Sequence, residues 1–241
     1  AGRKEINQDS LGFKLPSDDS IHTKGVAVAI ADGISSSEVS QFASAAAVQG
    51  FLADYYSTSD AWSLKTSALK VLTAINAWLY SQSLHSHLAS DMNRGYVCTF
   101  SAIIFKSSTG HIFHSGDARI YKVHNDHLEQ LTKDHRFQIN ANKSYLTRAF
   151  GMEEHVEFDY RSFPLQSGDN FVLATDGVYE FINHRDIIHA LENGLDNLDL
   201  AAEKLANLAL ERGSNDNLSI QLIHIEKLPN LTENEILKQL T

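Results

Sequence analysis

Two apolar segments of this sequence each end in the pair Asp-Gly. Residues 25–31 lead to Asp32-Gly33, and residues 170–175 lead to Asp176-Gly177. Short apolar runs that stop at turn residues are typical of buried strands. A strand that ends in aspartate holds a carboxylate at the rim of its sheet, and the glycine after it leaves room for a backbone carbonyl or solvent. One such pair is better explained by a turn, whereas two in the same strand setting favour a metal site.

The segments around these two strands predict the rest of the architecture. Apolar residues recur at helical spacing over residues 38–56 and 61–84, which predicts two long helices in tandem. Residues 96–131 contain four short apolar runs separated by turn residues, which is typical of an antiparallel meander. A helix over 198–212 and a last strand over 217–225 complete the pattern. Strands next to paired helices, without strict alternation of the two, favour an α+β fold with helices packed on sheets.

The composition excludes several classes of protein. A chain of 241 residues with 43% hydrophobic content can bury one large core, so we expect one domain over 1–226 and a tail over 227–241. The formal net charge of -10 argues against a nucleic-acid partner. No apolar run approaches the roughly 20 residues of a membrane span. Cys98 lies in an apolar stretch, and we expect it to be a buried thiol of a cytoplasmic protein.

Three more aspartates lie at predicted strand boundaries: Asp9, Asp117 and Asp216. Sites rich in carboxylate oxygens select hard cations such as Mg²⁺ and Mn²⁺, which keep several water ligands. The 12 histidines are scattered and lack zinc-like spacing, so we expect them at the surface or as satisfied core residues. The aspartates therefore carry the prediction of a metal site.

The order of these motifs resembles the metal-dependent protein phosphatase family (PPM, or type 2C), in its bacterial branch, over residues 3–225. The matching segments are, in chain order, Asn7-Gln8-Asp9-Ser10, Ala31-Asp32-Gly33, Gly116-Asp117-Ala118-Arg119-Ile120-Tyr121, Leu131-Thr132-Lys133-Asp134-His135, Leu146-Thr147-Arg148-Ala149-Phe150-Gly151, Ala174-Thr175-Asp176-Gly177-Val178-Tyr179 and Ser214-Asn215-Asp216-Asn217-Leu218-Ser219. Each segment alone is a weak signal, and their common order is a strong one. The resemblance implies a β-sandwich of two antiparallel sheets flanked by antiparallel helix pairs.

The resemblance also implies a two-metal site for Mn²⁺ or Mg²⁺. Asp32 would bridge the two ions, with the carbonyl of Gly33 on one of them and Asp176 and Asp216 completing the other. Two cations lower the pKa of a shared water, which attacks phosphorus in line, and they neutralise the phosphoryl oxygens. No protein nucleophile is needed for such a reaction.

Two further aspartates receive roles from the same resemblance. Asp9 would hold metal-bound water and so belongs, with Asp32, to the predicted catalytic residues. Asp117, together with Asp176, would match the position of a third, weaker metal in bacterial relatives. The predicted metal residues are thus Asp32, Gly33, Asp176, Asp216 and Asp117.

The chain departs from the family at the position of the arginine that binds substrate phosphate. The family usually has an arginine five residues before the position of Asp9, whereas here Lys4 has that spacing and Arg3 precedes it. Lysine is a point charge without the bidentate fork of arginine, so either substrate affinity is weaker or Arg3 reaches in. Both side chains could instead be solvated terminal cations.

Two other departures concern the surroundings of the site. Eukaryotic members carry a histidine after the position of Gly33 as an acid for the leaving group, where this chain has Ile34 and three serines. We expect these serines to cap the helix that begins near residue 38. Between His135 and Leu146 the family's flap is shortened, which predicts a more open cleft.

The predicted activity is hydrolysis of phosphoserine and phosphothreonine in a phosphorylated protein substrate. Two alternatives remain open: a catalytically silent module that binds phosphoprotein or regulates a partner, and a phosphatase for small phosphoesters. The complete set of aspartates argues against a silent site, because only a metal offsets their mutual repulsion. The tail resembles a linker or docking helix, amphipathic over 233–240, and its start resembles a junction to a protein kinase domain in the same full-length chain.

Overall fold

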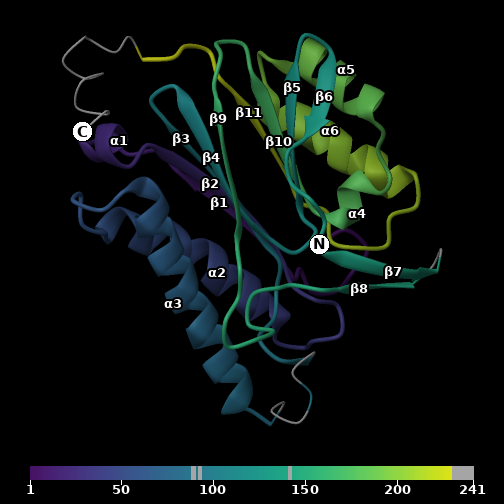
Figure 1. Ribbon diagram of the computed structural model, residues 1–241. Coiled ribbons are helices and arrows are strands. Elements are labelled where there is room, and N and C mark those ends of the chain that lie inside the picture. Colours follow the sequence, from purple (N-terminus) through teal and green to yellow (C-terminus); the bar gives the residue numbers. More distant parts are fainter. Residues whose placement is uncertain (88–90, 92–93, 141–142, 230–241) are drawn as a thin grey trace.

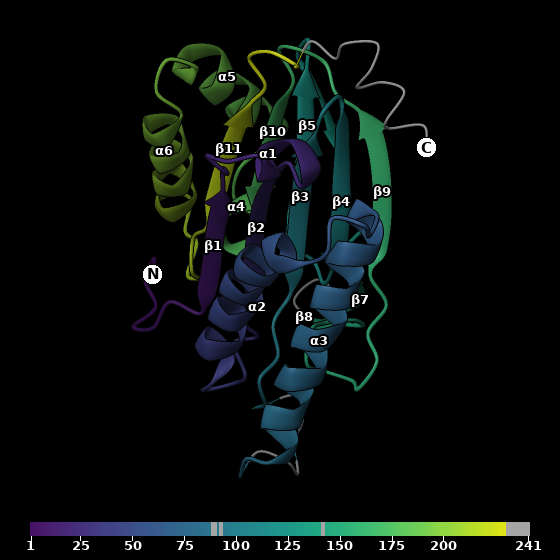
Figure 2. The same cartoon turned by 90° about the vertical axis from the view of Figure 1, so that its left-hand side faces the viewer.

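The chain folds into two antiparallel sheets stacked face to face, and a helix pair covers the outer face of each (Figure 1; Figure 2). This computed structural model describes residues 1–87, 91, 94–140 and 143–229. The first sheet has the strand order β1 (Asp9–Lys14), β2 (Val26–Asp32), β3 (Phe100–Lys106), β4 (Thr109–Ser115) and β9 (Asp159–Pro164). The second has the order β11 (Ile220–His224), β10 (Asn170–Ala174), β5 (Arg119–His124) and β6 (His127–Gln130).

Helices account for the two outer layers. The long helices α2 (Ser40–Asp54) and α3 (Leu64–Leu84) cover the first sheet, and α5 (His184–Gly194) and α6 (Leu198–Glu211) cover the second (Figure 1). The short elements are α1 (Ser20–Thr23), the 3-10 turn η1 (Tyr55–Ser57) and α4 (Asp176–Tyr179). A separate hairpin of β7 (Arg136–Asn140) and β8 (Lys143–Leu146) projects at the end of the sandwich near α4 (Figure 1).

The alternation of β2 shows why the layers stack in this way. Its alanines Ala27, Ala29 and Ala31 belong to the core under α2 and α3, whereas Val28 and Ile30 belong to the core between the sheets. Successive side chains of a strand point to opposite faces, so one strand can serve both cores. The small residues face the helices and allow a close approach, while the branched residues fill the space between the sheets.

The structure confirms the predicted β-sandwich with flanking helix pairs and an α6 close to the predicted 198–212. The first of the four runs predicted within 96–131 becomes a strand only at Phe100, because Cys98 forms isolated bridges to Gly33 and Phe150 instead of continuing the ladder. The predicted serine cap is wrong. Helix α2 begins at Ser40 without a side-chain cap, and the hydroxyl oxygen of Ser37 lies 2.8 Å from the carbonyl oxygens of residues 94 and 95.

The C-terminal segment leaves the sandwich after β11. Leu228 packs against the core between the sheets, so the first residues of the predicted tail are attached to the domain. The amphipathic stretch predicted over 233–240 lies outside the described residues, and the division at residue 226 stays a prediction. Among the described helices, none combines the length and apolar character needed to span a membrane.

Candidate metal centre

Four of the predicted aspartates meet in one cleft at the end of the sandwich. Asp32 ends β2, Asp176 follows β10 as the first residue of α4, Asp117 lies between β4 and β5, and Asp216 precedes β11. All four line a cavity of about 490 Å³. The remaining lining residues are Gly33, Ile34, Ser35, Ser36, Thr99, Arg136, Tyr145, Leu146, Met152. Elements far apart in sequence therefore deliver carboxylates from both sheets to one place.

Asp9 lies beside this cleft as the strand partner of Asp32. The two residues are directly opposite each other in the β1–β2 ladder, and Asp9 is 9% exposed. Its Oδ2 accepts a hydrogen bond of 3.0 Å from the hydroxyl of Thr175. Its Oδ1 is buried and has no hydrogen-bond partner among the described residues. Buried oxygens are nearly always satisfied, so this atom calls for water or a cation.

The glycines after the two strand-end aspartates permit close backbone contacts. A Cβ on Gly177 would lie 2.0 Å from the carbonyl oxygen of Asn217, and one on Gly33 would lie 2.8 Å from that of Gln8. Neither position tolerates a side chain without movement of the backbone. Gly177 therefore lets the chain that carries Asp176 lie against the loop that carries Asp216, and Gly33 lets the end of β2 lie against Gln8. The sequence pattern predicted such an approach of a carbonyl.

The carboxylates of the cleft are shielded from water and repel one another, which raises their pKa values. Burial, followed by the charges of Asp9, Asp176, Asp117 and Asp216, raises the pKa of Asp32 well above its ordinary value. Burial also raises the pKa of Asp117 to about 7, although Arg136 opposes the shift. The pKa of Asp176 is raised by burial and by Asp216, again against Arg136. Desolvated carboxylates that repel one another favour the uptake of a cation or a proton.

The two candidate phosphate-binding cations occupy different positions. Lys4 lies at the cleft, with Nζ 2.5 Å from Oδ1 of Asp216 and donating to the hydroxyl of Ser35 at 2.8 Å. Arg3 turns toward the end of α6, where its Nη1 donates to the side chain of Asn215 at 3.1 Å. Of the two, Lys4 is thus the cation positioned next to cleft residues.

Arg136 is a cleft residue to which sequence reasoning gave no role. It is the first residue of β7, and its guanidinium contacts Asp117, Asp176 and Glu180. The motif Asp134-His135 ends just before it, but no spacing in the sequence indicates which carboxylates the arginine meets. The contact depends on where the hairpin joins the sandwich, which is a property of the tertiary structure.

Within the described part of the chain, no three His, Cys, Asp or Glu side chains are already arranged around a common metal position. Lys4 and Arg136 pair with three of the carboxylates instead. The donor set nevertheless fits a hard divalent cation, because it consists of oxygen ligands alone. The unpartnered Oδ1 of Asp9 points to the same conclusion.

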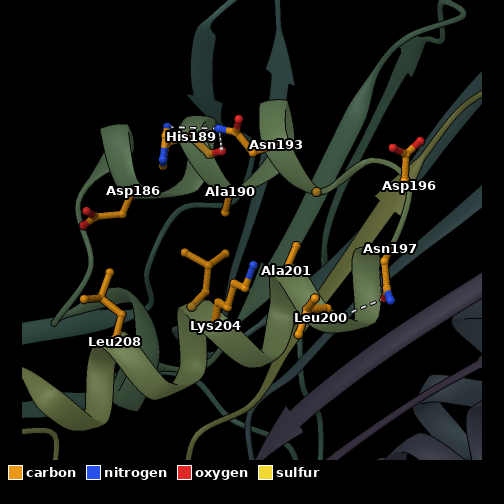
Figure 3. Close-up of a pocket in the computed structure, with 12 residues that line it drawn as sticks. Asp186, His189, Ala190, Asn193, Asp196, Asn197, Leu200, Ala201, Lys204 and Leu208 are labelled. Carbon is orange, nitrogen blue, oxygen red and sulfur yellow. Dashed lines mark hydrogen bonds between the residues drawn. The ribbon is translucent and has the colours of Figure 1, made fainter.

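A second cavity, of about 270 Å³, lies between α5 and α6 and shares no lining residue with the cleft (Figure 3). Its lining is mainly apolar, and several of its polar groups are engaged within their own helices. Asn193 donates to the carbonyl of His189 at 2.8 Å, and Asn197 accepts from the amide of Leu200 at 3.0 Å (Figure 3). The cluster of carboxylates therefore marks the cleft, rather than this cavity, as the candidate site.

Comparison with known proteins identifies relatives of this chain. A family model described as protein phosphatase 2C matches residues 2–219. The serine/threonine phosphatase stp of Listeria innocua is 28% identical over 219 residues, covering 81% of this chain and 83% of that protein. The S. agalactiae serine/threonine phosphatase structure has a TM-score of 0.79 at 24% identity and covers 93% of this chain and 95% of its own.

A second solved structure, the Mycobacterium tuberculosis serine/threonine phosphatase PstP, has a TM-score of 0.76 at 23% identity. The match covers 93% of this chain and 94% of that one. At these identities the two structures establish a shared fold, and the family-model match extends over most of the sequence. The chain belongs to the protein phosphatase 2C family.

Proposed function

We propose that this chain hydrolyses phosphoserine and phosphothreonine in phosphoproteins with the help of two bound Mn²⁺ or Mg²⁺ ions. The observation that carries the proposal is the meeting of Asp32, Asp117, Asp176 and Asp216 in one cleft, with Asp9 beside Asp32. The names of the relatives, which are serine/threonine phosphatases, support the same activity. A buried free thiol at Cys98 is compatible with the reducing cytoplasm that we propose as its location.

In this proposal Asp32 would be shared by the two ions, the carbonyl of Gly33 would help to hold one of them, and Asp176 and Asp216 would hold the other. When bound, the cations lower the pKa of a water molecule, orient it for in-line attack on phosphorus and neutralise the phosphoryl oxygens. The unpartnered Oδ1 of Asp9 would accept a hydrogen bond from this water, while the hydroxyl of Thr175 donates to Oδ2 and holds the carboxylate in place.

The leaving alkoxide of serine or threonine must take up a proton. The described residues that line the cleft include no histidine. His135 is engaged elsewhere: its Nδ1 accepts from the amide of Gly116 at 3.1 Å, and its Nε2 is 3.1 Å from Oδ2 of Asp159. We therefore assign the proton to solvent water rather than to a side chain of this chain.

The proposal is tested by hydrolysis of a phosphothreonine peptide and of p-nitrophenyl phosphate with Mn²⁺, with Mg²⁺ and with a chelator. We expect activity with either metal, none after chelation, and recovery when the metal is restored. Activity that survives chelation would contradict the two-metal proposal. Inactivity under all conditions, with the fold intact, would favour a phosphoprotein-binding module. Turnover of the small ester alone would favour a phosphatase for small phosphoesters.

Replacing Lys4 with alanine should weaken substrate binding more than chemistry. The ammonium of Lys4 lies beside Asp216 and Ser35, where it can meet substrate phosphate. Loss of a contact made equally in the ground and transition states raises KM and leaves kcat nearly unchanged. We expect KM for the phosphopeptide to rise about tenfold, which corresponds to the free energy of one lost charge-assisted hydrogen bond.

Arg3→Ala is the matched control for this measurement. Arg3 contacts Asn215 outside the cleft, so its removal should leave both kinetic constants close to those of the wild type. If Arg3→Ala raises KM while Lys4→Ala does not, the assignment of the phosphate-binding cation must be reversed.

A further inference from the structure

The guanidinium of Arg136 occupies the end of the cleft formed by Asp117 and Asp176. Its Nε lies 2.7 Å from Oδ2 of Asp117, and its Nη2 lies 2.8 Å from Oδ2 of Asp176. Its Nη1 lies 2.6 Å from Oε1 of Glu180. Each nitrogen of the guanidinium thus contacts a different carboxylate. A lysine ammonium lacks the planar fork that makes these three contacts possible.

The contact with Asp117 is largely removed from water. The side chain of Asp117 is 6% exposed and that of Arg136 is 22% exposed, whereas Glu180 at the outer end is 48% exposed. Among the ion pairs between described residues, Arg136 is the one cation paired with Asp117. Separating a buried ion pair is costly, because each partner is left as an uncompensated charge. This cost keeps Arg136 and Asp117 in contact.

A divalent ion held between Asp117 and Asp176 would compete with the guanidinium for these two carboxylates, because the Oδ2 atom of each already pairs with Arg136. Arg136 brings one positive charge to three carboxylates, so the end of the cleft keeps a net negative charge and still attracts a cation. Two cations close to one pair of carboxylates repel each other strongly at these distances. The guanidinium and a metal ion at this position therefore exclude one another.

We propose that Arg136 is an internal cation that competes with a third metal ion for Asp117 and Asp176. The inference rests on the proposed function, but it concerns only the position next to the two catalytic ions. While the arginine is docked, the chain works with two ions. Because only the undocked fraction can bind, an arginine docked 99% of the time would raise the apparent dissociation constant of the third ion about 100-fold.

Displacement of Arg136 would also affect the β7–β8 hairpin, which forms part of the wall of the cleft. Arg136 begins β7 and pairs with Leu146 at the end of β8, and both Tyr145 and Leu146 line the cleft. Displacing the arginine removes the ionic anchor of this hairpin. Binding of the third ion and release of the hairpin are then linked, and each affects the other by the same factor.

The experiment counts bound Mn²⁺ by the electron paramagnetic resonance signal of free Mn²⁺ during titration. Wild type should bind two ions tightly and a third weakly. In Arg136→Ala we expect the dissociation constant of the third ion to fall by about 10- to 100-fold, with the first two nearly unchanged. Adding Asp117→Asn to Arg136→Ala should abolish the third ion, which locates it at this position.

Arg161→Ala is the matched control, because Arg161 pairs with Glu129 at 2.8 Å and does not line the cleft. It should titrate like the wild type. Arg136→Lys keeps the charge but reaches fewer carboxylates, so an intermediate third-ion affinity is expected even if the alanine variant folds poorly. As a second readout, amide hydrogen exchange in the hairpin should increase in wild type as the third ion binds.

Two results would overturn the inference alone: equal third-ion affinity in Arg136→Ala and wild type, or three equally tight ions in wild type. Absence of any tightly bound Mn²⁺ in every variant would instead remove the proposed two-metal function, and the competition with it. The two failures are therefore distinguishable in one titration series.

Discussion

Asp32→Asn should lower kcat with saturating Mn²⁺ by at least about 1,000-fold, since electrostatic stabilisation at the reacting centre is usually worth that much. The reason is its position at the centre of the cleft. Its pKa is raised by burial and then by the surrounding aspartates, so it is the carboxylate most exposed to their repulsion. Asparagine has nearly the same shape but neither the charge nor the second acceptor oxygen needed to bridge two ions.

The same substitution should stabilise the metal-free protein. Without metal, the charge of Asp32 is desolvated and repelled by its neighbours, and asparagine removes both costs. In the presence of a chelator the variant should therefore unfold at a higher temperature than wild type. Added Mn²⁺ should raise the unfolding temperature of wild type and have little effect on the variant, because ligands stabilise only the state that binds them.

Asp126→Asn is the control for both measurements. Asp126 is exposed in the turn between β5 and β6 at a positive φ of 60°, a conformation that asparagine adopts as readily as aspartate. It should change neither activity nor stability. A kcat for Asp32→Asn within tenfold of wild type, or a lower unfolding temperature in chelator, would show that Asp32 does not bridge metal ions.

The fold could be predicted where a segment carries its own pattern. The buried strand β2 and helix α6 were visible because their apolar residues recur at strand or helix spacing over most of their length. Strand β9 was missed, since it lies at a sheet edge and its residues are mostly exposed or half-buried, which leaves no apolar run. Helix α5 was missed despite a visible signal, the capping box of Asn183 and Asp186.

The site could be predicted as far as its aspartates, because each lies at a strand boundary and both sheets end at the same rim. The positions of the cationic side chains around these aspartates could not be predicted. Sequence alone left Lys4 and Arg3 as equal candidates, and only the position of the N-terminal segment brings Lys4 to Asp216 and Arg3 to Asn215. Arg136 was missed for the same reason, since its three partners come from two other parts of the chain, the loop before β5 and helix α4 with its C-cap.

Gly177→Ala is expected to destabilise the fold by about 3 kcal/mol or more, because overpacking against a fixed backbone is costly. The added Cβ would lie 2.0 Å from the carbonyl oxygen of Asn217 and 3.0 Å from the Cβ of Asp216. A flexible side chain could rotate away, but a backbone carbonyl cannot. Asn217 is also tied to the N-terminal segment, since its side chain accepts from the amide of Gln8 at 2.9 Å and donates to the carbonyl of Ile6 at 3.0 Å.

Relief of this clash must separate α4 from the loop before β11, and that movement carries Asp176 away from Asp216. Gly177→Ala should therefore lose Mn²⁺ affinity as well as stability, measured by urea unfolding and by the Mn²⁺ titration. Gly50→Ala in helix α2 makes the same chemical change where the new Cβ meets only Ile75, at 3.4 Å. The Gly50→Ala substitution should leave the free energy of unfolding unchanged or raise it by about 0.5–1 kcal/mol, because alanine is preferred over glycine in a helix. If Gly177→Ala matches this control in both measurements, the close packing at the Asp-Gly pair is not what holds the two aspartates together.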